Sequence, residues 1–200
     1  MTPPLVLVSV GTDHHPFDRL VAWVDSWVDA QAGDVELVVQ HGTSRPSRTG
    51  ENYTIIPRTR LLELFREATV VVTQVGPGTI LDANSVGRRP IVMARDPRLG
   101  EAVDGHQVPF GHFMADRGTA WITDSEAGLH THLDRALEDP AYSRVPERHS
   151  PADQTAAAMQ QVVDDVLSRR PGWFKLSRLP QVRQVRPERP APPEHVRSSS

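Results

Sequence analysis

Short apolar runs alternate with longer amphipathic segments along most of the chain. The runs are rich in β-branched residues, as is typical of strands that a parallel sheet buries on both faces. They cover residues 5–10, 35–40, 53–56, 69–73, 90–94 and 119–122. Between them, apolar side chains recur at intervals of three and four residues, which predicts amphipathic helices.

The predicted helices follow the strands in regular alternation. They cover a segment from Phe17 that ends before Gly33, a segment around 61–65, and residues 80–86, 105–117, 127–137 and 152–167. Such alternation predicts βαβ units. We therefore expect an α/β fold, a doubly wound, mostly parallel Rossmann-like sheet with helices on both faces.

Ligands of such sheets bind at the carboxyl ends of the strands. Candidate functional residues are therefore those that directly follow a strand. These segments are 11–13, 40–42, 57–59, 74–79 and 95–107.

Gly76, Pro77, Gly78 and Thr79 lie between the most strand-like run and a helix. Glycines allow a ligand to approach the backbone, and the start of the helix offers N–H donors and a positive dipole end. Since Pro77 has no N–H, we expect Gly78, Thr79 and Ile80 to donate, with a diphosphate as acceptor. A tight turn capped by Thr79 is the structural alternative. No Lys-Ser/Thr pair follows and no G-x-G-x-x-G follows the first strand, which disfavours ATP hydrolysis and dinucleotide binding.

Two further groups of polar residues are candidate ligand contacts. Asp82, one helical turn after Thr79, can accept from two ribose hydroxyls or can interact with the helix dipole. Asp104, His106 and Gln107 cluster at the predicted start of a helix, where they can bind sugar hydroxyls or serve as a solvated cap.

The histidines after the first two strands have less specific interpretations. Asp13, His14 and His15 suggest a metal, but neighbouring histidines rarely both ligate and the chain has no cysteine. We therefore predict a phosphate-facing turn made by Gly11 and Thr12, no metal and no cofactor. His41 is either an acid–base group or a solvated loop residue.

Composition adds limits on location and ligand. The chain has no cysteine and no apolar run long enough to cross a bilayer or to form a signal peptide, so we expect a cytoplasmic protein. Residues 171–200 carry six basic and two acidic side chains and six prolines, which predicts a disordered tail after a folded domain of residues 1–170. The net charge of the whole chain is −3, so the rest is acidic, which argues against nucleic acid as its ligand.

Three segments in order resemble the C-terminal domain of family 28 glycosyltransferases, above all bacterial exopolysaccharide transferases. They are residues 8–12, residues 68–73 running into 76–79, and residues 99–107, within a match from Leu5 to Ile122. The resemblance implies the GT-B arrangement of two Rossmann-like domains, with a UDP-sugar held mainly by the C-terminal one. Gln74 stands where many relatives have a histidine.

The resemblance also assigns roles by position. Catalytic roles fall to Gly78, Thr79 and His106. The donor site as a whole is expected to comprise Gly11, Thr12, Ile56, Gly76, Gly78, Thr79, Asp82, Asp104, His106 and Gln107. Within that set, Ile56 and residues 57–59 flank the uracil, Asp82 replaces a ribose-binding Glu, and His106 and Gln107 face the sugar.

The implied function is that of the catalytic, donor-binding subunit of a metal-independent inverting glycosyltransferase. It would move a hexose-type sugar from a UDP-sugar to a lipid-linked acceptor in cell-surface polysaccharide or glycolipid synthesis. Its partner would be a membrane-associated acceptor-binding subunit. The chain itself could also contact the inner face of the cell membrane as a peripheral protein. The alternative is a non-catalytic nucleotide-sugar-binding module with a regulatory or scaffold role.

Overall fold

The computed structural model describes residues 3–31 and 35–147. The helix predicted at 152–167, the domain boundary predicted after residue 170 and the tail predicted at 171–200 all lie outside the described residues.

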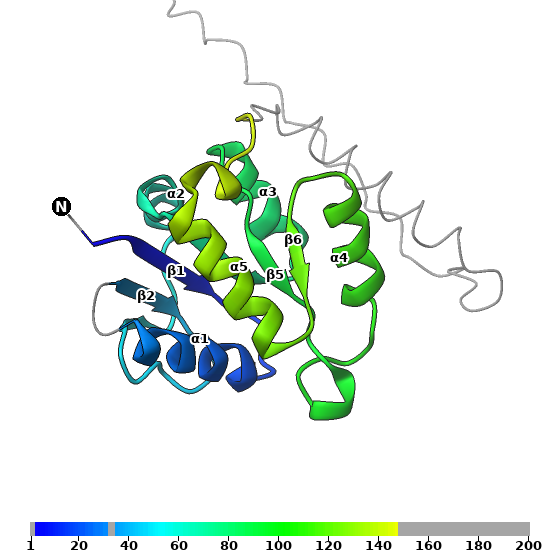
Figure 1. Cartoon of the computed structure of the whole chain (residues 1–200). Coiled ribbons are helices and arrows are strands. Elements are labelled where there is room, and N and C mark those ends of the chain that lie inside the picture. Colours follow the sequence, from blue (N-terminus) through cyan, green and yellow to red (C-terminus); the bar gives the residue numbers. More distant parts are fainter. Residues whose placement is uncertain (1–2, 32–34, 148–200) are drawn as a thin grey trace, which may run out of the picture. The chain divides into compact units, whose positions relative to one another are not determined.

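One sheet of six parallel strands organises the described chain (Figure 1). The strands are β1 (Leu5–Ser9), β2 (Glu36–Gln40), β3 (Glu51–Tyr53), β4 (Val70–Gln74), β5 (Ile91–Met93) and β6 (Trp121–Thr123). Their spatial order is β3-β2-β1-β4-β5-β6, so the winding direction reverses between β1 and β4. A crevice at the carboxyl ends of these two strands is the usual ligand site of a doubly wound sheet.

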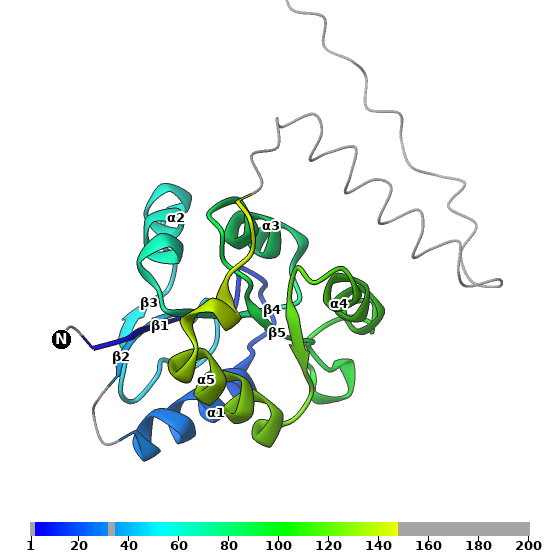
Figure 2. The same cartoon turned by 45° about the horizontal axis from the view of Figure 1, so that its top comes forward.

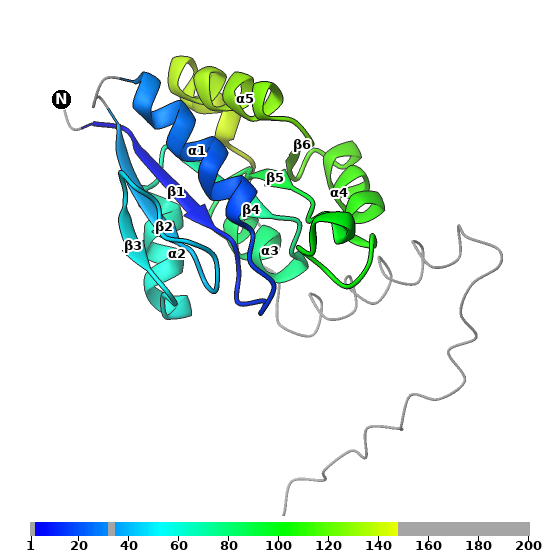
Figure 3. The same ribbon diagram turned by 90° about the horizontal axis from the view of Figure 1, so that it is seen from below.

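Helices cover both faces of the sheet, as Figures 2 and 3 show. One face carries α1 (Asp18–Ala30) and α5 (Glu126–Glu138), and the other carries α2 (Arg58–Glu67), α3 (Pro77–Ser85) and α4 (Gln107–Asp116). Two short 3-10 helices follow, Pro97–Leu99 after β5 and Pro140–Ser143 after α5. Side chains of β1 alternate between the two cores: Val6 and Val8 pack with α1 and α5, and Leu7 packs with α2. The doubly wound α/β prediction is confirmed.

Two strand predictions were displaced along the chain. The third strand is Glu51–Tyr53 rather than 53–56, because the chain leaves the sheet edge after Tyr53 and the backbone N–H of Ile56 donates to Gln40 Oε1 instead. The last strand begins at Trp121 rather than at Thr119, because the Thr119 N–H and hydroxyl both donate to the Met114 carbonyl at the end of α4.

Candidate functional site

A buried arginine links the loops at the carboxyl edge of the sheet. Arg95 follows β5 and is 1% exposed. Its guanidinium donates to the carbonyls of Val10 (2.8 Å), His15 (2.6 Å) and Glu101 (3.1 Å). Burial lowers the pKa of Arg95, although Asp13 and Glu101 oppose this effect. The arginine therefore ties the loop after β1 to the loop after β5. Sequence reasoning missed it.

Gln74, the last residue of β4, is oriented by the same arginine. Arg95 Nε donates to Gln74 Oε1 at 2.6 Å, which turns Gln74 Nε2 toward the glycines after β1 and β4. A Cβ built on Gly11 would lie 2.1 Å from that nitrogen, and Gly11 has a φ of +79°. Only glycine fits there. Gln74 Nε2 has no hydrogen-bond partner among the described residues, so it is a free donor at the carboxyl ends of β1 and β4.

The first turn of α3 is open beside this amide. Gly76 is its N-cap, and a Cβ built on Gly78 would meet no described atom within 4 Å. The Ile80 N–H donates to the Gly76 carbonyl, so the prediction that it serves a ligand was wrong. The N–H groups of Gly78 and Thr79 have no acceptor among the described residues. Two backbone donors and the helix dipole thus point into open space, an arrangement suited to an anion.

Asp82 lies one turn further along α3 and is already paired. Arg58, at the start of α2, donates to both carboxylate oxygens, at 2.6 and 3.0 Å. The aspartate side chain is 21% exposed and the arginine 71%. A ribose would have to share Asp82 with the exposed Arg58 or displace it, and the sequence did not indicate this partner.

The segment between β5 and α4 is anchored by a buried carboxylate. Glu101 accepts from Arg19 Nε (3.0 Å) and Nη2 (2.7 Å), and from the Asp96 N–H (2.8 Å). Asp96 in turn pairs with the exposed Arg98, which lowers the pKa of Asp96 to about 2. Glu101, which the sequence analysis gave no role, therefore fixes the loop against α1.

Three predicted sugar contacts sit at the end of that loop. Gln107 Oε1 accepts from the Arg95 N–H at 3.1 Å, so Arg95 and Gln107 position each other. Asp104 and His106 are both exposed, and Asp104 Oδ1 accepts from the His106 N–H at 3.0 Å and lies 2.5 Å from His106 Nδ1. The His106 N–H, and then its ring, lower the pKa of Asp104. The structure brings these three together at the start of α4.

The remaining predicted residues are distributed around β1 and β2. Thr12 is exposed beside Gly11, and Ile56 is buried with its N–H bonded to Gln40. His41 Nδ1 bonds with the Ser44 carbonyl at 2.8 Å and so braces its own loop. Asp13, His14 and His15 have candidate metal-ligand atoms within 4.8 Å of one another.

Two hollows on the described surface are not lined by the α3 turn. The larger, of about 730 Å³, lies by β3 and α2 and reaches Leu5 and Glu36 at the starts of β1 and β2, and Thr69 just before β4. The smaller, of about 570 Å³, lies between the loop after β5 and α4. The chemistry favours the carboxyl ends of β1 and β4 over the larger hollow, because three donors without an acceptor among the described residues follow these strands. None of the described helices is both long and apolar enough to span a membrane.

Comparison with protein families gives a match over most of the chain. Residues 5–163 match the model of the glycosyltransferase family 28 C-terminal domain. A search of curated proteins gives no match.

Several solved structures share the fold. The MurG of Acinetobacter baumannii is 14% identical with a TM-score of 0.54, covering 81% of this chain and 50% of that one. ALG13 is 17% identical with a TM-score of 0.51, covering 82% of this chain and 97% of that one. The glycotransferase of kitacinnamycin is 17% identical with a TM-score of 0.51, covering 82% of this chain and 40% of that one. The chain thus spans half or less of two of these proteins and nearly the whole of the third.

Proposed function

The chain belongs to glycosyltransferase family 28 through its C-terminal domain, and on this premise we propose that it is the donor-binding catalytic subunit of an inverting glycosyltransferase. The donor would be a UDP-sugar carrying a hexose-type sugar. The acceptor would be a lipid-linked sugar in cell-surface polysaccharide or glycolipid synthesis.

The observation that carries this proposal is the open first turn of α3. The N–H groups of Gly78 and Thr79 have no acceptor among the described residues, and Gln74 Nε2 is a third donor without one. A diphosphate bound there would gain negative charge as the sugar leaves. Fixed donors aimed at that charge stabilise the transition state without reorganising. The proposal therefore needs neither a metal ion nor a covalent intermediate.

The other predicted contacts have places in the same proposal. Gly11 and Thr12 would approach the phosphates from the end of β1, and Asp82 would accept from the ribose once Arg58 is displaced. Asp104, His106 and Gln107 would bind the sugar from the start of α4, with His106 closest to the reacting bond. The carbonyl of Ile56 would serve the uracil, since its N–H already donates to Gln40.

The acceptor side of the site would come from a second domain. The match covers only half the length of MurG, whereas it covers nearly the whole length of ALG13. We therefore propose that a separate, membrane-associated subunit binds the acceptor, and that the complex works at the cytoplasmic face of the membrane.

The test of the donor assignment is thermal stabilisation by nucleoside diphosphates. A ligand that binds only the folded state at a hundredfold excess over its Kd stabilises it by about 2.7 kcal/mol. UDP should raise Tm in this way, and ADP and GDP should do so much less. Equal shifts with all three diphosphates would refute the uridine assignment.

Gln74 supports a second candidate function, a nucleotide-sugar-binding module without catalysis. A neutral amide can hold a diphosphate but cannot give it a proton. Release of UDP from a UDP-sugar, measured after co-expression with the membrane subunit, separates the two functions. Turnover supports the transferase, and tight binding of UDP without turnover supports the module.

A further inference from the structure

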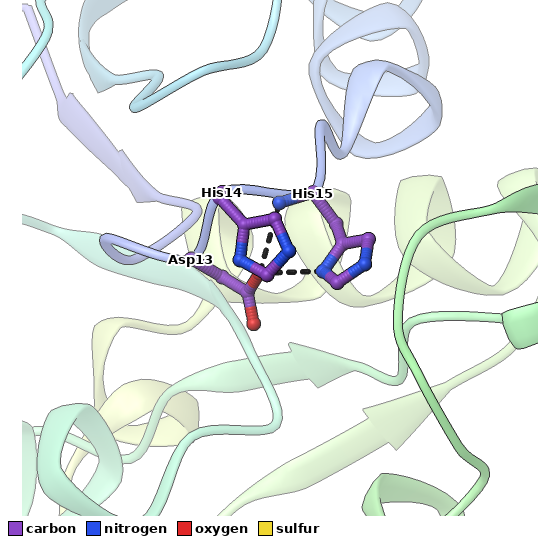
Figure 4. Close-up of side chains that lie close together, drawn as sticks. All are labelled: Asp13, His14 and His15. Atoms are coloured by element: carbon purple, nitrogen blue, oxygen red, sulfur yellow. Dashed lines mark hydrogen bonds and ion pairs between the residues drawn. The ribbon is translucent and has the colours of Figure 1, made fainter.

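Asp13 and His15 form a hydrogen-bonded carboxylate–imidazole pair in the loop after β1. Asp13 Oδ1 lies 2.8 Å from His15 Nδ1 and also accepts from the His15 N–H at 2.8 Å, as Figure 4 shows. A carboxylate at Nδ1 favours the tautomer that carries its proton there and leaves Nε2 as a proton acceptor.

The pair is held from both sides by the fold. Arg95 donates to the His15 carbonyl, and Thr43 Oγ1 donates to the Asp13 carbonyl at 3.2 Å. The His15 side chain is 22% exposed, whereas that of His14 is 83% exposed. The His15 N–H is the largest cause of the lowered pKa of Asp13, which keeps that carboxylate ionised. His15 is thus more buried than His14 and lies closer to the shared Asp13 oxygen.

The same arginine links the backbone of His15 to Gln74 at the proposed donor site. Arg95 donates to the His15 carbonyl through Nη1 and to Gln74 Oε1 through Nε, each at 2.6 Å. Gln74 Nε2 faces the glycine turns that would hold the diphosphate. One guanidinium therefore holds both the backbone of His15 and the side chain of Gln74.

We infer that His15, oriented by Asp13, is the general base that accepts the proton of the acceptor hydroxyl; this rests on the proposed transferase function. The acceptor oxygen forms its bond to the anomeric carbon as its proton passes to His15 Nε2. The bond from that carbon to the diphosphate oxygen breaks, and its electron pair leaves with UDP. Asp13 stabilises the resulting imidazolium, and the proton then passes to solvent.

The rival interpretation of these residues is a divalent metal site. Asp13, His14 and His15 offer three ligand atoms within 4.8 Å of one another. Ligation through His15 Nδ1 would, however, break its bond to Asp13, and His14 Nδ1 lies 3.4 Å from the same Asp13 oxygen. The hydrogen-bonded geometry favours the base, and the experiment includes the metal as an outcome.

The first readout needs no turnover. Long-range ¹H–¹⁵N spectra of the full chain at mildly alkaline pH report which ring nitrogen of each histidine carries the proton. His15 should have its proton on Nδ1, and Asp13→Asn should shift its population toward the Nε2–H form. A His15 with its proton on Nε2 in the wild-type protein would overturn the inference.

The second readout compares two neighbouring substitutions in the complex with the membrane subunit. His15→Gln should lower kcat by about 10²- to 10⁴-fold, the usual contribution of a general base, with unchanged UDP affinity and Tm. His14→Gln, the matched control, should stay within about twofold of wild type, as expected of an exposed side chain that lies farther from Asp13 Oδ1 than His15 does. Asp13→Asn should fall between them.

Three outcomes would overturn the inference. One is a His15→Gln variant that transfers sugar as fast as the His14→Gln variant. Another is equal loss in both variants together with loss in a chelator and recovery with Zn²⁺, which would establish the metal site. If wild-type protein fails to discriminate UDP from ADP and GDP, the proposed function itself is wrong and the inference falls with it.

Discussion

Replacing Arg95 by Met is expected to destabilise the domain and loosen the donor site together. Methionine keeps the length of the side chain but supplies no donor. The carbonyls of Val10, His15 and Glu101, and Gln74 Oε1, would each lose a hydrogen bond.

The magnitude follows from how deeply these acceptors lie. The bonds to the carbonyls of Val10 and Glu101 are buried, whereas those to His15 and Gln74 are only partly so. Each buried acceptor left without a donor costs about 1–3 kcal/mol. Removing a charge whose burial lowers its own pKa offsets part of that loss. We therefore expect the free energy of unfolding to fall by about 2–4 kcal/mol.

Urea unfolding measures this change, with Arg98→Met as the matched control. Arg98 is also an arginine, but its side chain is 88% exposed. Its substitution should therefore lower the free energy of unfolding by no more than about 0.5 kcal/mol. Titration with UDP should show weaker binding in Arg95→Met, because Gln74 loses its orientation. An Arg95→Met variant as stable as Arg98→Met, with wild-type UDP affinity, would refute the network.

Three further predictions concern the ribose, acid stability and the tail. Asp82→Ala should weaken UDP binding by roughly 10- to 150-fold, because it removes a charge-assisted contact worth about 1.5–3 kcal/mol, whereas Arg58→Ala should not weaken it. Calorimetric titration measures both affinities, and an unchanged affinity in Asp82→Ala would mean that Asp82 pairs with Arg58 and does not bind the ribose. The pKa of Asp96 is depressed to about 2, so its contribution to stability is present above the unfolded pKa of 3.8 and is lost as pH falls through about 2. Urea unfolding between these pH values should therefore show that the free energy of unfolding falls less in Asp96→Asn than in wild type. An equal fall in the two proteins would contradict this. Deleting residues 171–200 should leave UDP binding intact but reduce co-sedimentation with anionic vesicles or co-purification with the membrane subunit, and retention of both would contradict a role in either.

The strands could be predicted because the sheet is buried on both faces. Each buried strand then appears as a continuous apolar run, as in β1 and β4. The edge strand β3 is exposed at all three positions and has no such signal, so the predicted strand was placed too far along the chain, ending at the buried Ile56 in the following loop.

The position of the candidate site was predictable, but its internal network was not. Residues that follow parallel strands converge at one edge, and so Gly11 and Gly78 could be assigned to it. The sequence around Arg95 shows only a charged residue in a polar loop, because its partners Val10 and Gln74 are distant in sequence. The pairing of Asp82 with Arg58 spans 24 positions and was hidden for the same reason.

The most direct test of the account is UDP binding by Gly78→Ala. A Cβ at Gly78 would meet no described atom within 4 Å, so the fold should accept it, and replacing a helical glycine should raise stability by about 0.5–1 kcal/mol. If the diphosphate lies on this turn, the added methyl group takes its space, at a cost of about 1–3 kcal/mol, or roughly 5- to 150-fold in Kd. Calorimetry should therefore show weaker UDP binding in a protein that is at least as stable as wild type. Unchanged UDP affinity in Gly78→Ala would contradict the placement of the donor at α3.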